Sequence, residues 1–144
     1  MEALLKHQQS THCSHKTTIV ISNVKDVGGL KIAMNYGVSA EAIEHFPTNS
    51  TMHPAPRQKH EEMIHSRLTE LDIEVVILSG YMRILSPWFV ERWEGRLLNI
   101  HPSLLPKFPG AHAHKDVLDS GENITGCTVH FVDMGVDSGQ IIAQ

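Results

Sequence analysis

The sequence has little cysteine, little excess of charge and no long hydrophobic run. Its two cysteines, Cys13 and Cys127, lie far apart without a Cys-x-x-Cys pair, so neither a disulfide framework nor a zinc knuckle is indicated. The longest apolar runs, such as Val75–Leu78, are far too short to span a bilayer, and Met1–Gln9 is too polar for a signal peptide core. The net charge of -4, without a cluster of Lys and Arg, argues against nucleic acid or an anionic membrane as partner. These absences favour a cytoplasmic protein that binds a small ligand.

Enough apolar residues are present for one hydrophobic core. With 144 residues, of which 41% are hydrophobic and 19% charged, the chain has the composition of one globular domain. The histidines are numerous but scattered, and His112-x-His114 alone does not supply the three or four convergent ligands that a metal site needs. We therefore expect no bound metal, and we expect Cys127 to pack as a small apolar residue.

Strand patterns alternate with helix patterns along the chain. Apolar, β-branched runs predict strands at Thr18–Ser22 and at Glu74–Ser79, and the second is expected to be covered on both faces. Between them, Arg57–Leu71 predicts an amphipathic helix with Leu68 on its apolar stripe and Glu61 outside that stripe. Further predicted elements are helices at Met1–Gln9, around Leu30–Met34, at Pro87–Trp93 and at His114–Ser120, strands at Val38–His45, Gly126–Val132 and Gln140–Ala143, and a proline-rich loop at Pro47–Pro56. This alternation predicts an α/β fold with a mainly parallel sheet.

The segment Leu97–Pro106 begins as a buried strand and ends as a loop with two prolines. Side chains two positions apart on a strand share a face, so Asn99 and His101 point the same way. Pro102 cannot donate to the strand ladder, which places this pair at the carboxyl end of a strand, where open α/β sheets bind their ligands. As an isolated Asn-x-His, the pair is also consistent with a turn cap and a packed histidine, so the pattern alone leaves both interpretations open.

Asp137 follows the strand that carries His130 and is the candidate acid of the site. If Asp137 folds back onto His101, its carboxylate would favour the charged form of the imidazole and fix its orientation. Asn99 would then donate a hydrogen bond to an oxygen that gains negative charge at a tetrahedral carbon. Together the three residues would suit acyl-type transfer to an amine without a serine or cysteine nucleophile. The spacing does not establish this contact, and the alternative is a solvated turn aspartate near Gly139.

Three long motifs resemble the phosphoribosylglycinamide formyltransferase family. They are Gly80-Tyr-Met-Arg-Ile-Leu-Ser86, Leu98-Asn-Ile-His-Pro-Ser-Leu-Leu-Pro106, and Gly126-Cys-Thr-Val-His-Phe-Val132 with Asp137 and Gly139-Gln-Ile-Ile-Ala-Gln144. The resemblance extends over almost the whole chain. It implies a doubly wound, formyltransferase-like α/β fold and a single partial domain over residues 1–144. It also implies transfer of a formyl group from 10-formyltetrahydrofolate to the amine of glycinamide ribonucleotide in purine biosynthesis.

By matching positions, the resemblance implies roles for particular residues. His101 would be the proton donor, Asp137 the acid that favours its charged form, and Asn99 the contact to the formyl oxygen. The folate cosubstrate would be held by Arg57, Met82, Arg83, Ile84, Leu85, Asn99, Asp133, Met134, Gly135, Val136 and Asp137. The apolar members of this set suit the flat face of a pterin, and Arg57 suits a carboxylate of the glutamyl tail. Without the resemblance, the apolar members would be interpreted as core and Arg57 as a surface residue.

The family also has parts that we expect this chain to lack. A first strand with a Gly-x-Gly-Ser-Asn turn binds the substrate phosphate in the family, and a C-terminal helical region helps to hold the ribose. Without that strand, Thr18–Ser22 and Glu74–Ser79 are expected to flank a gap in the sheet. Other functions therefore stay open: a formyltetrahydrofolate deformylase or methionyl-tRNA formyltransferase, which share the Asn-x-His and Asp core, and a non-catalytic folate-binding remnant. Formate release without an acceptor would indicate the deformylase, and binding without turnover the remnant.

Overall fold

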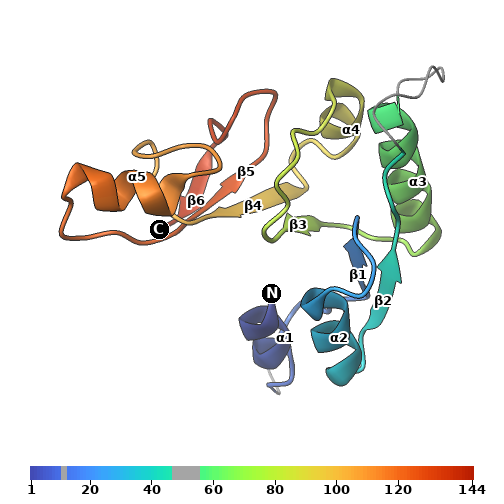
Figure 1. Ribbon diagram of the computed structural model, residues 1–144. Helices are drawn as coiled ribbons and strands as arrows, with labels where there is room; N and C mark the ends of the chain where they lie inside the picture. Colours follow the sequence, from blue (N-terminus) through green and yellow to red (C-terminus); the bar gives the residue numbers. More distant parts are fainter. Residues whose placement is uncertain (11–12, 47–55) are drawn as a thin grey trace. The chain divides into compact units, whose positions relative to one another are not determined.

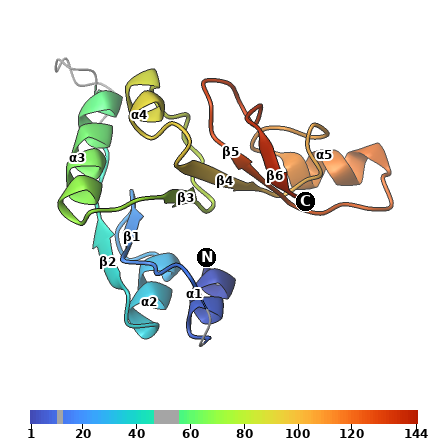
Figure 2. The ribbon, with the colours of Figure 1, turned by 180° about the vertical axis from the view of Figure 1, so that it is seen from behind.

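The computed structural model describes residues 1–10, 13–46 and 56–144 (Figures 1 and 2). The chain divides into two compact units, Met1–Ile73 and Glu74–Gln144. Of the predicted loop at Pro47–Pro56, all but the last residue lie outside the described residues. Within the described ranges, no helix combines the length and apolar character needed to cross a membrane.

The first unit is built on a parallel strand pair with a helical crossover. Its elements are α1 (Glu2–Gln8), β1 (Ile19–Ser22), α2 (Gly28–Asn35), β2 (Ser39–Ala42) and α3 (Pro56–Glu70). Strands β1 and β2 pair in parallel from Ile19 opposite Ser39 to Ser22 opposite Ala42, and α2 contacts both strands. All five elements match the predicted ones to within a few residues. For α2, the apolar spacing marks the helix, and Gly37, in the left-handed region at φ 71, marks its end.

Helix α3 buries two polar side chains that its sequence pattern did not identify. His60, Glu61 and Leu68 are its buried residues, so the expectation that Glu61 lies outside the packed face is wrong. The ring of His60 lies 2.7 Å from the carbonyl oxygen of Ile43, which anchors this turn of the helix. Near the other end, Nε of Arg67 donates to Glu41 on β2 at 2.8 Å, and this hydrogen bond raises the pKa of Arg67.

The second unit contains the Asn-x-His strand in a four-stranded sheet. Its elements are β3 (Val76–Leu78), α4 (Pro87–Arg92), β4 (Leu97–His101), α5 (Ala113–Ser120), β5 (Thr128–Phe131) and β6 (Ile141–Ala143). The strand order is β3-β4-β5-β6, with β3 and β4 parallel and the pairs β4–β5 and β5–β6 antiparallel. Strands β1 and β3 belong to different sheets.

The core of the second unit lies around α4. Ser86 caps the helix, with its Oγ accepting from the backbone N–H of Phe89 at 3.4 Å, and Pro87 occupies the first turn as its sequence predicts. Phe89, Trp93 and Leu97 are each at most 2% exposed and form the interior of this unit. Burying such side chains supplies roughly 1.5–3 kcal/mol each, so this cluster stabilises the strand that carries the site.

Two expectations about burial in the second unit are wrong. Strand β3 is covered on one face only, because Val75 and Ile77 are 49% and 40% exposed while the alternate residues Val76 and Leu78 are half-buried. Cys127 is exposed because it belongs to the irregular segment before β5, in which every residue from position 121 to 127 is exposed. Apolar character alone predicted both positions as buried.

Candidate active site

One face of the β4–β5 pair gathers four polar side chains. In the antiparallel register Asn99 lies opposite His130, and His101 lies opposite Thr128. Cross-strand partners share a face of the sheet, so the four side chains form one patch. His101, Thr128 and His130 are at most 4% exposed. The predicted common face of Asn99 and His101 is therefore present, and the sheet adds two residues to it.

Asp137 completes this patch from the loop between β5 and β6. Its Oδ2 lies 3.3 Å from Nδ1 of His101 and accepts the backbone N–H of Gly110 at 2.7 Å. Its Oδ1 lies 3.3 Å from Nδ2 of Asn99 and 3.5 Å from Nε2 of His130. The structure thus brings together Asn99, His101 and Asp137, which the sequence singled out from distant positions. Four groups surround one carboxylate, which fixes both of its oxygens.

The loop that carries Asp137 is held by its own side chains and by one glycine. Oδ1 of Asp133 accepts the N–H of Gly135 at 3.0 Å and the hydroxyl of Ser138 at 2.9 Å. A Cβ atom at Gly139 would lie 1.8 Å from the carbonyl oxygen of Phe131. Only glycine therefore allows the loop to return this closely to β5, and this return sets the position of Asp137.

A backbone carbonyl holds the other side of the His101 ring. Nε2 of His101 donates to the carbonyl oxygen of Phe108 at 2.8 Å. Phe108 has a φ of 58°, in the left-handed region, which turns this carbonyl toward the ring. Since Asp137 faces Nδ1, both ring nitrogens face acceptors, an arrangement that an imidazole with two N–H groups satisfies fully.

The segment from Ser103 to Phe108, called the strap below, is tied down by buried hydroxyls. Oγ of Ser103 donates to the carbonyl of Lys107 at 2.6 Å and lies 3.2 Å from that of Phe108. Oγ1 of Thr128 accepts the N–H of Leu105 at 3.0 Å and donates to the carbonyl of Ser103 at 2.7 Å. These bonds fix the strap that presents the Phe108 carbonyl to His101.

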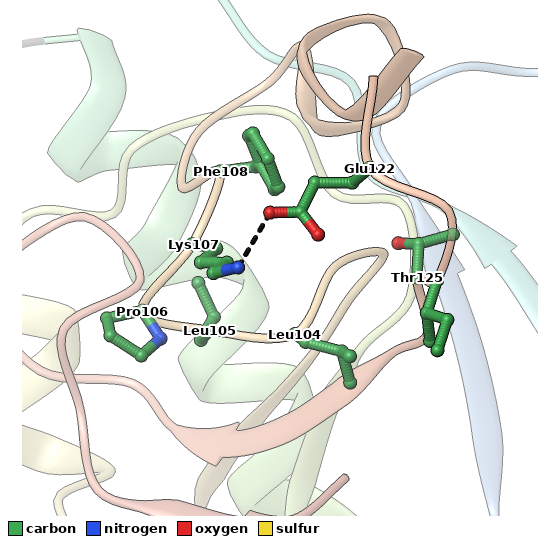
Figure 3. Close-up of a pocket in the computed structure, with 8 residues that line it drawn as sticks. Leu104, Leu105, Pro106, Lys107, Phe108, Glu122 and Thr125 are labelled. Carbon is green, nitrogen blue, oxygen red and sulfur yellow. Dashed lines mark hydrogen bonds and ion pairs between the residues drawn. The ribbon is translucent and has the colours of Figure 1, made fainter. Parts of the chain in front are cut away.

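The strap also lines a small cavity. Figure 3 shows this cavity, with the ion pair between Lys107 and Glu122, at 2.7 Å, beside it. Its volume is about 300 Å³, and its lining comes from the strap and from the segment after α5, with Leu104, Leu105, Pro106, Lys107, Phe108, Glu122, Ile124 and Thr125. None of Asn99, His101 and Asp137 lines it, so it is separate from the acid–imidazole–amide cluster.

A larger cleft of about 380 Å³ adjoins that cluster. Its walls come from the segment after β3, the end of β4, and the loop after β5: they include Leu78, Gly80, Tyr81, Met82, Arg83, Ile84, Leu85, Val90, Asn99, Ile100, His101, Pro102, Gly110, Ala111, His130, Val132, Asp133, Met134, Gly135, Val136 and Asp137. Met82, Ile84, Met134 and Val136 are each more than half exposed. Large apolar side chains that are exposed in a cleft suit a flat, partly apolar ligand.

Every residue predicted to hold the folate lines this cleft except Arg57. Arg57 is an exposed residue at the start of α3, in the first unit. His112 and His114 are also exposed, at the start of α5. Among the residues that the structure describes, no three His, Cys, Asp or Glu side chains are grouped so that they could hold a metal ion.

Comparison with known proteins places this geometry in a family. The family model described as formyl transferase matches residues 1–144, which is the whole chain. The chain belongs to the formyl transferase family. It is 43% identical over 144 residues to the trifunctional purine biosynthetic protein adenosine-3 of Homo sapiens, covering 100% of this chain and 14% of the human protein. It is 38% identical over 148 residues to the phosphoribosylglycinamide formyltransferase of Escherichia coli, covering 100% of this chain and 65% of that enzyme.

Solved structures of the same family agree with the fold. The glycinamide ribonucleotide transformylase 1 of Symbiobacterium toebii superimposes with a TM-score of 0.86 at 36% identity, covering 99% of this chain and 64% of that one. The phosphoribosylglycinamide formyltransferase of Brucella melitensis superimposes with a TM-score of 0.86 at 38% identity, covering 99% of this chain and 70% of that one. The predicted family and the α/β formyltransferase fold are thereby confirmed. This formyl transferase family member spans less than two thirds of the length of the human and Escherichia coli relatives.

Proposed function

We propose that this chain transfers a formyl group from 10-formyltetrahydrofolate to the amine of glycinamide ribonucleotide, a step of purine biosynthesis. The observation that carries the proposal is that Asp137 contacts both Asn99 and His101 beside a cleft with apolar walls. The family membership of the chain and the names of its relatives suggest the substrate class. We further propose that both compact units are parts of one formyltransferase domain, since a single family model spans residues 1–144. The cytoplasmic location stays a prediction.

In this proposal the folate occupies the cleft of the second unit. The pterin lies between the exposed apolar side chains of the segment after β3, Met82 and Ile84, and those of the loop after β5, Met134 and Val136. Backbone groups of these irregular segments are available to the hydrogen-bonding edges of the pterin. The pairing of Arg57 with a carboxylate of the glutamyl tail stays a prediction.

The reaction forms one C–N bond and breaks another. The amine nitrogen of the ribonucleotide attacks the formyl carbon, and the carbonyl oxygen gains the negative charge of a tetrahedral intermediate. The bond from this carbon to N10 of the folate then breaks, N10 takes a proton, and the attacking nitrogen loses one. His101 supplies the proton for N10 and becomes neutral, and the proton lost by the attacking nitrogen restores its charge. Asp137, 3.3 Å away, stabilises the positive form of the ring. No covalent intermediate on the protein is needed.

Asn99 and His101 can donate a hydrogen bond to the substrate only if they give up one that they already make within the protein. Nδ2 of Asn99 lies 3.2 Å from Nε2 of His130 and 3.3 Å from Oδ1 of Asp137, so both amide hydrogens are used. The two N–H groups of a charged His101 are used by Phe108 and Asp137. We infer that the negative oxygen of the intermediate competes with these acceptors for the hydrogens of Asn99 and His101.

The test is transfer of an isotopically labelled formyl group. The chain is incubated with labelled 10-formyltetrahydrofolate, with and without glycinamide ribonucleotide, and the label is followed in the ribonucleotide and in formate. Label in the ribonucleotide, lost in the variant His101→Ala, is the expected result. Label in formate without acceptor would indicate a deformylase instead. Calorimetric binding of a folate analogue with no transfer of label would indicate a folate-binding protein, and either result would overturn the proposal.

The variant His101→Ala also needs a matched control. His114→Ala changes the same residue type at an exposed position of α5 that does not line the cleft. We expect His101→Ala to reduce turnover by roughly 10²–10⁴-fold, the usual contribution of a general acid or base, and to leave folate binding largely intact. His114→Ala is expected to change neither quantity. Equal loss of binding and turnover in His101→Ala would argue against a proton role.

A further inference from the structure

His130 is a buried, polar residue of the site. It has no role in the reaction described above. It is 2% exposed, lies opposite Asn99 in the β4–β5 register, and lines the cleft. Its Nδ1 lies 2.8 Å from the carbonyl oxygen of Phe131. A carbonyl oxygen can only accept a hydrogen bond, so Nδ1 carries a hydrogen.

The second ring nitrogen of His130, Nε2, carries either a lone pair or a hydrogen. The atoms around it determine which. Nε2 lies 3.2 Å from Nδ2 of Asn99, which is a donor, and 3.5 Å from Oδ1 of Asp137. A hydrogen on Nε2 would face the donor at the shorter distance and reach the carboxylate only at the longer one. A lone pair on Nε2 accepts from Asn99 with ordinary geometry. The titratable groups around this contact are His101 and Asp137, and Asp137 already faces the ring of His101.

The orientation of the Asn99 amide follows from the same contacts. With Nδ2 toward His130 and Asp137, each amide hydrogen meets an acceptor. A flipped amide would place its oxygen against the carboxylate of Asp137, which is a repulsive contact. The carboxylate therefore fixes which end of the amide faces the acid, independently of the state of His130.

We propose that His130 is neutral, with its hydrogen on Nδ1, and serves as a positioning residue that fixes the Asn99 amide by accepting from it. It takes no part in proton transfer, which is left to His101 and Asp137. The tautomer is independent of the reaction, whereas its catalytic consequence rests on the proposed formyl transfer. Two buried histidines on one sheet face would thus have opposite tasks, one moving a proton and the other holding an amide.

The tautomer is tested directly by nitrogen-15 NMR of the 144-residue chain at neutral pH. We expect a pyrrole-like shift for Nδ1 of His130 and a pyridine-like shift for Nε2. His114, which is exposed at the start of α5, serves as the internal reference. Two pyrrole-like nitrogens, or a hydrogen on Nε2 alone, would overturn the proposal. This measurement needs no turnover, so its outcome is distinct from failure of the proposed function.

The positioning role is tested with a pair of variants. His130→Leu removes the acceptor, whereas His130→Gln keeps a carbonyl oxygen at a comparable reach from the strand. We expect His130→Leu to lower kcat by about tenfold to a hundredfold with a nearly unchanged KM for folate, and His130→Gln to recover most of the loss. The shape of the pH profile of kcat should stay that of the unmodified chain in both. The positioning role would be contradicted if either variant lost one limb of the pH profile of kcat, or if His130→Gln did not recover the kcat lost in His130→Leu.

Discussion

Oδ2 of Asp137 lies 3.3 Å from Nδ1 of His101, although α5 and β5 separate the two residues in the chain. Two different kinds of structure produce this contact. Strand β4 delivers His101 by simple alternation, while Asp137, at φ 51, sits in a loop that is closed by Asp133 and Gly139. The acid and the imidazole therefore depend on separate parts of the sequence, and each part can be tested on its own.

The charge of Asp137 is the first quantity to test. Asp137→Asn keeps the size of the side chain but removes the negative charge beside His101, so the charged imidazole loses its stabilisation. We expect turnover to fall by roughly 10²–10⁴-fold while the affinity for a folate analogue changes little. Steady-state kinetics and calorimetry provide the measurement. Asp119→Asn, at an exposed position of α5, is the control and should behave as the unmodified chain; an active Asp137→Asn would contradict the proposed role.

The amide of Asn99 provides a second test. Asn99→Ala removes the donor that faces both Asp137 and His130, and with it the proposed contact to the formyl oxygen. Loss of one donor to a developing oxyanion costs about 10²–10³-fold in kcat, and we expect a decrease of that order. Asn123→Ala, an exposed position in the same unit, should leave kcat unchanged. A larger effect on KM than on kcat would show that Asn99 acts in binding instead.

Ser103 tests whether the strap matters for stability and for the site. This residue is fully buried, and Ser103→Ala leaves the carbonyl of Lys107 without its donor at 2.6 Å. We expect a loss of about 1–3 kcal/mol in the free energy of unfolding, together with reduced turnover. Both tryptophans, Trp88 and Trp93, belong to the second unit, so their fluorescence during urea unfolding reports on that unit. Ser120→Ala is a surface control, and equal effects of the two variants would argue against a special role of the strap.

The apolar wall of the cleft is tested by charge. Ile84 is 66% exposed and lines the cleft, whereas Leu118 is 81% exposed on α5 and does not. Ile84→Asp places a carboxylate against the face of a bound pterin, and we expect the affinity for a folate analogue to fall by about tenfold or more, the equivalent of 1.4 kcal/mol. Leu118→Asp should leave the affinity unchanged. Binding that is insensitive to Ile84→Asp would place the folate elsewhere.

Gly139 tests the loop that positions Asp137. Gly139→Ala introduces a Cβ atom 1.8 Å from the carbonyl oxygen of Phe131, so the loop must move away from β5. We expect a loss of about 1–3 kcal/mol in unfolding free energy, as for other overpacking substitutions, and a loss of activity. Gly28→Ala, where nothing lies within 4 Å of the added atom, is the matched control and should not destabilise the chain. Unchanged unfolding in Gly139→Ala would refute this account of the loop.

Much of the fold was predictable because its signals are local. Apolar runs and the Ser-Pro and glycine boundaries placed the helices and strands to within a few residues. The period of two along β4 placed Asn99 and His101 on one face, and it placed Thr128 and His130 together on β5 in the same way. These patterns depend on neighbouring residues alone, so the sequence reveals them directly.

Contacts that depend on the whole unit were not predictable in this way. The burial of Glu61, the exposure of Cys127 and the open face of β3 result from packing between elements, which the pattern within one element does not contain. The meeting of Asp137 with His101 was accessible only as a hypothesis, since no spacing rule connects a strand to a distant loop. His130 could have been assigned to the site by pairing β5 with β4 in register, but the sequence does not reveal which strand pairs with β5.

The hydrogen bond from His101 to the carbonyl of Phe108 has a consequence for substitutions at position 108. A carbonyl belongs to the main chain, so replacing the phenyl ring at this position leaves the acceptor in place. Because φ is 58° there, glycine and asparagine are the residues that would adopt this conformation at the least cost. A substitution at position 108 therefore keeps the acceptor for His101 as long as the new residue adopts the same backbone conformation.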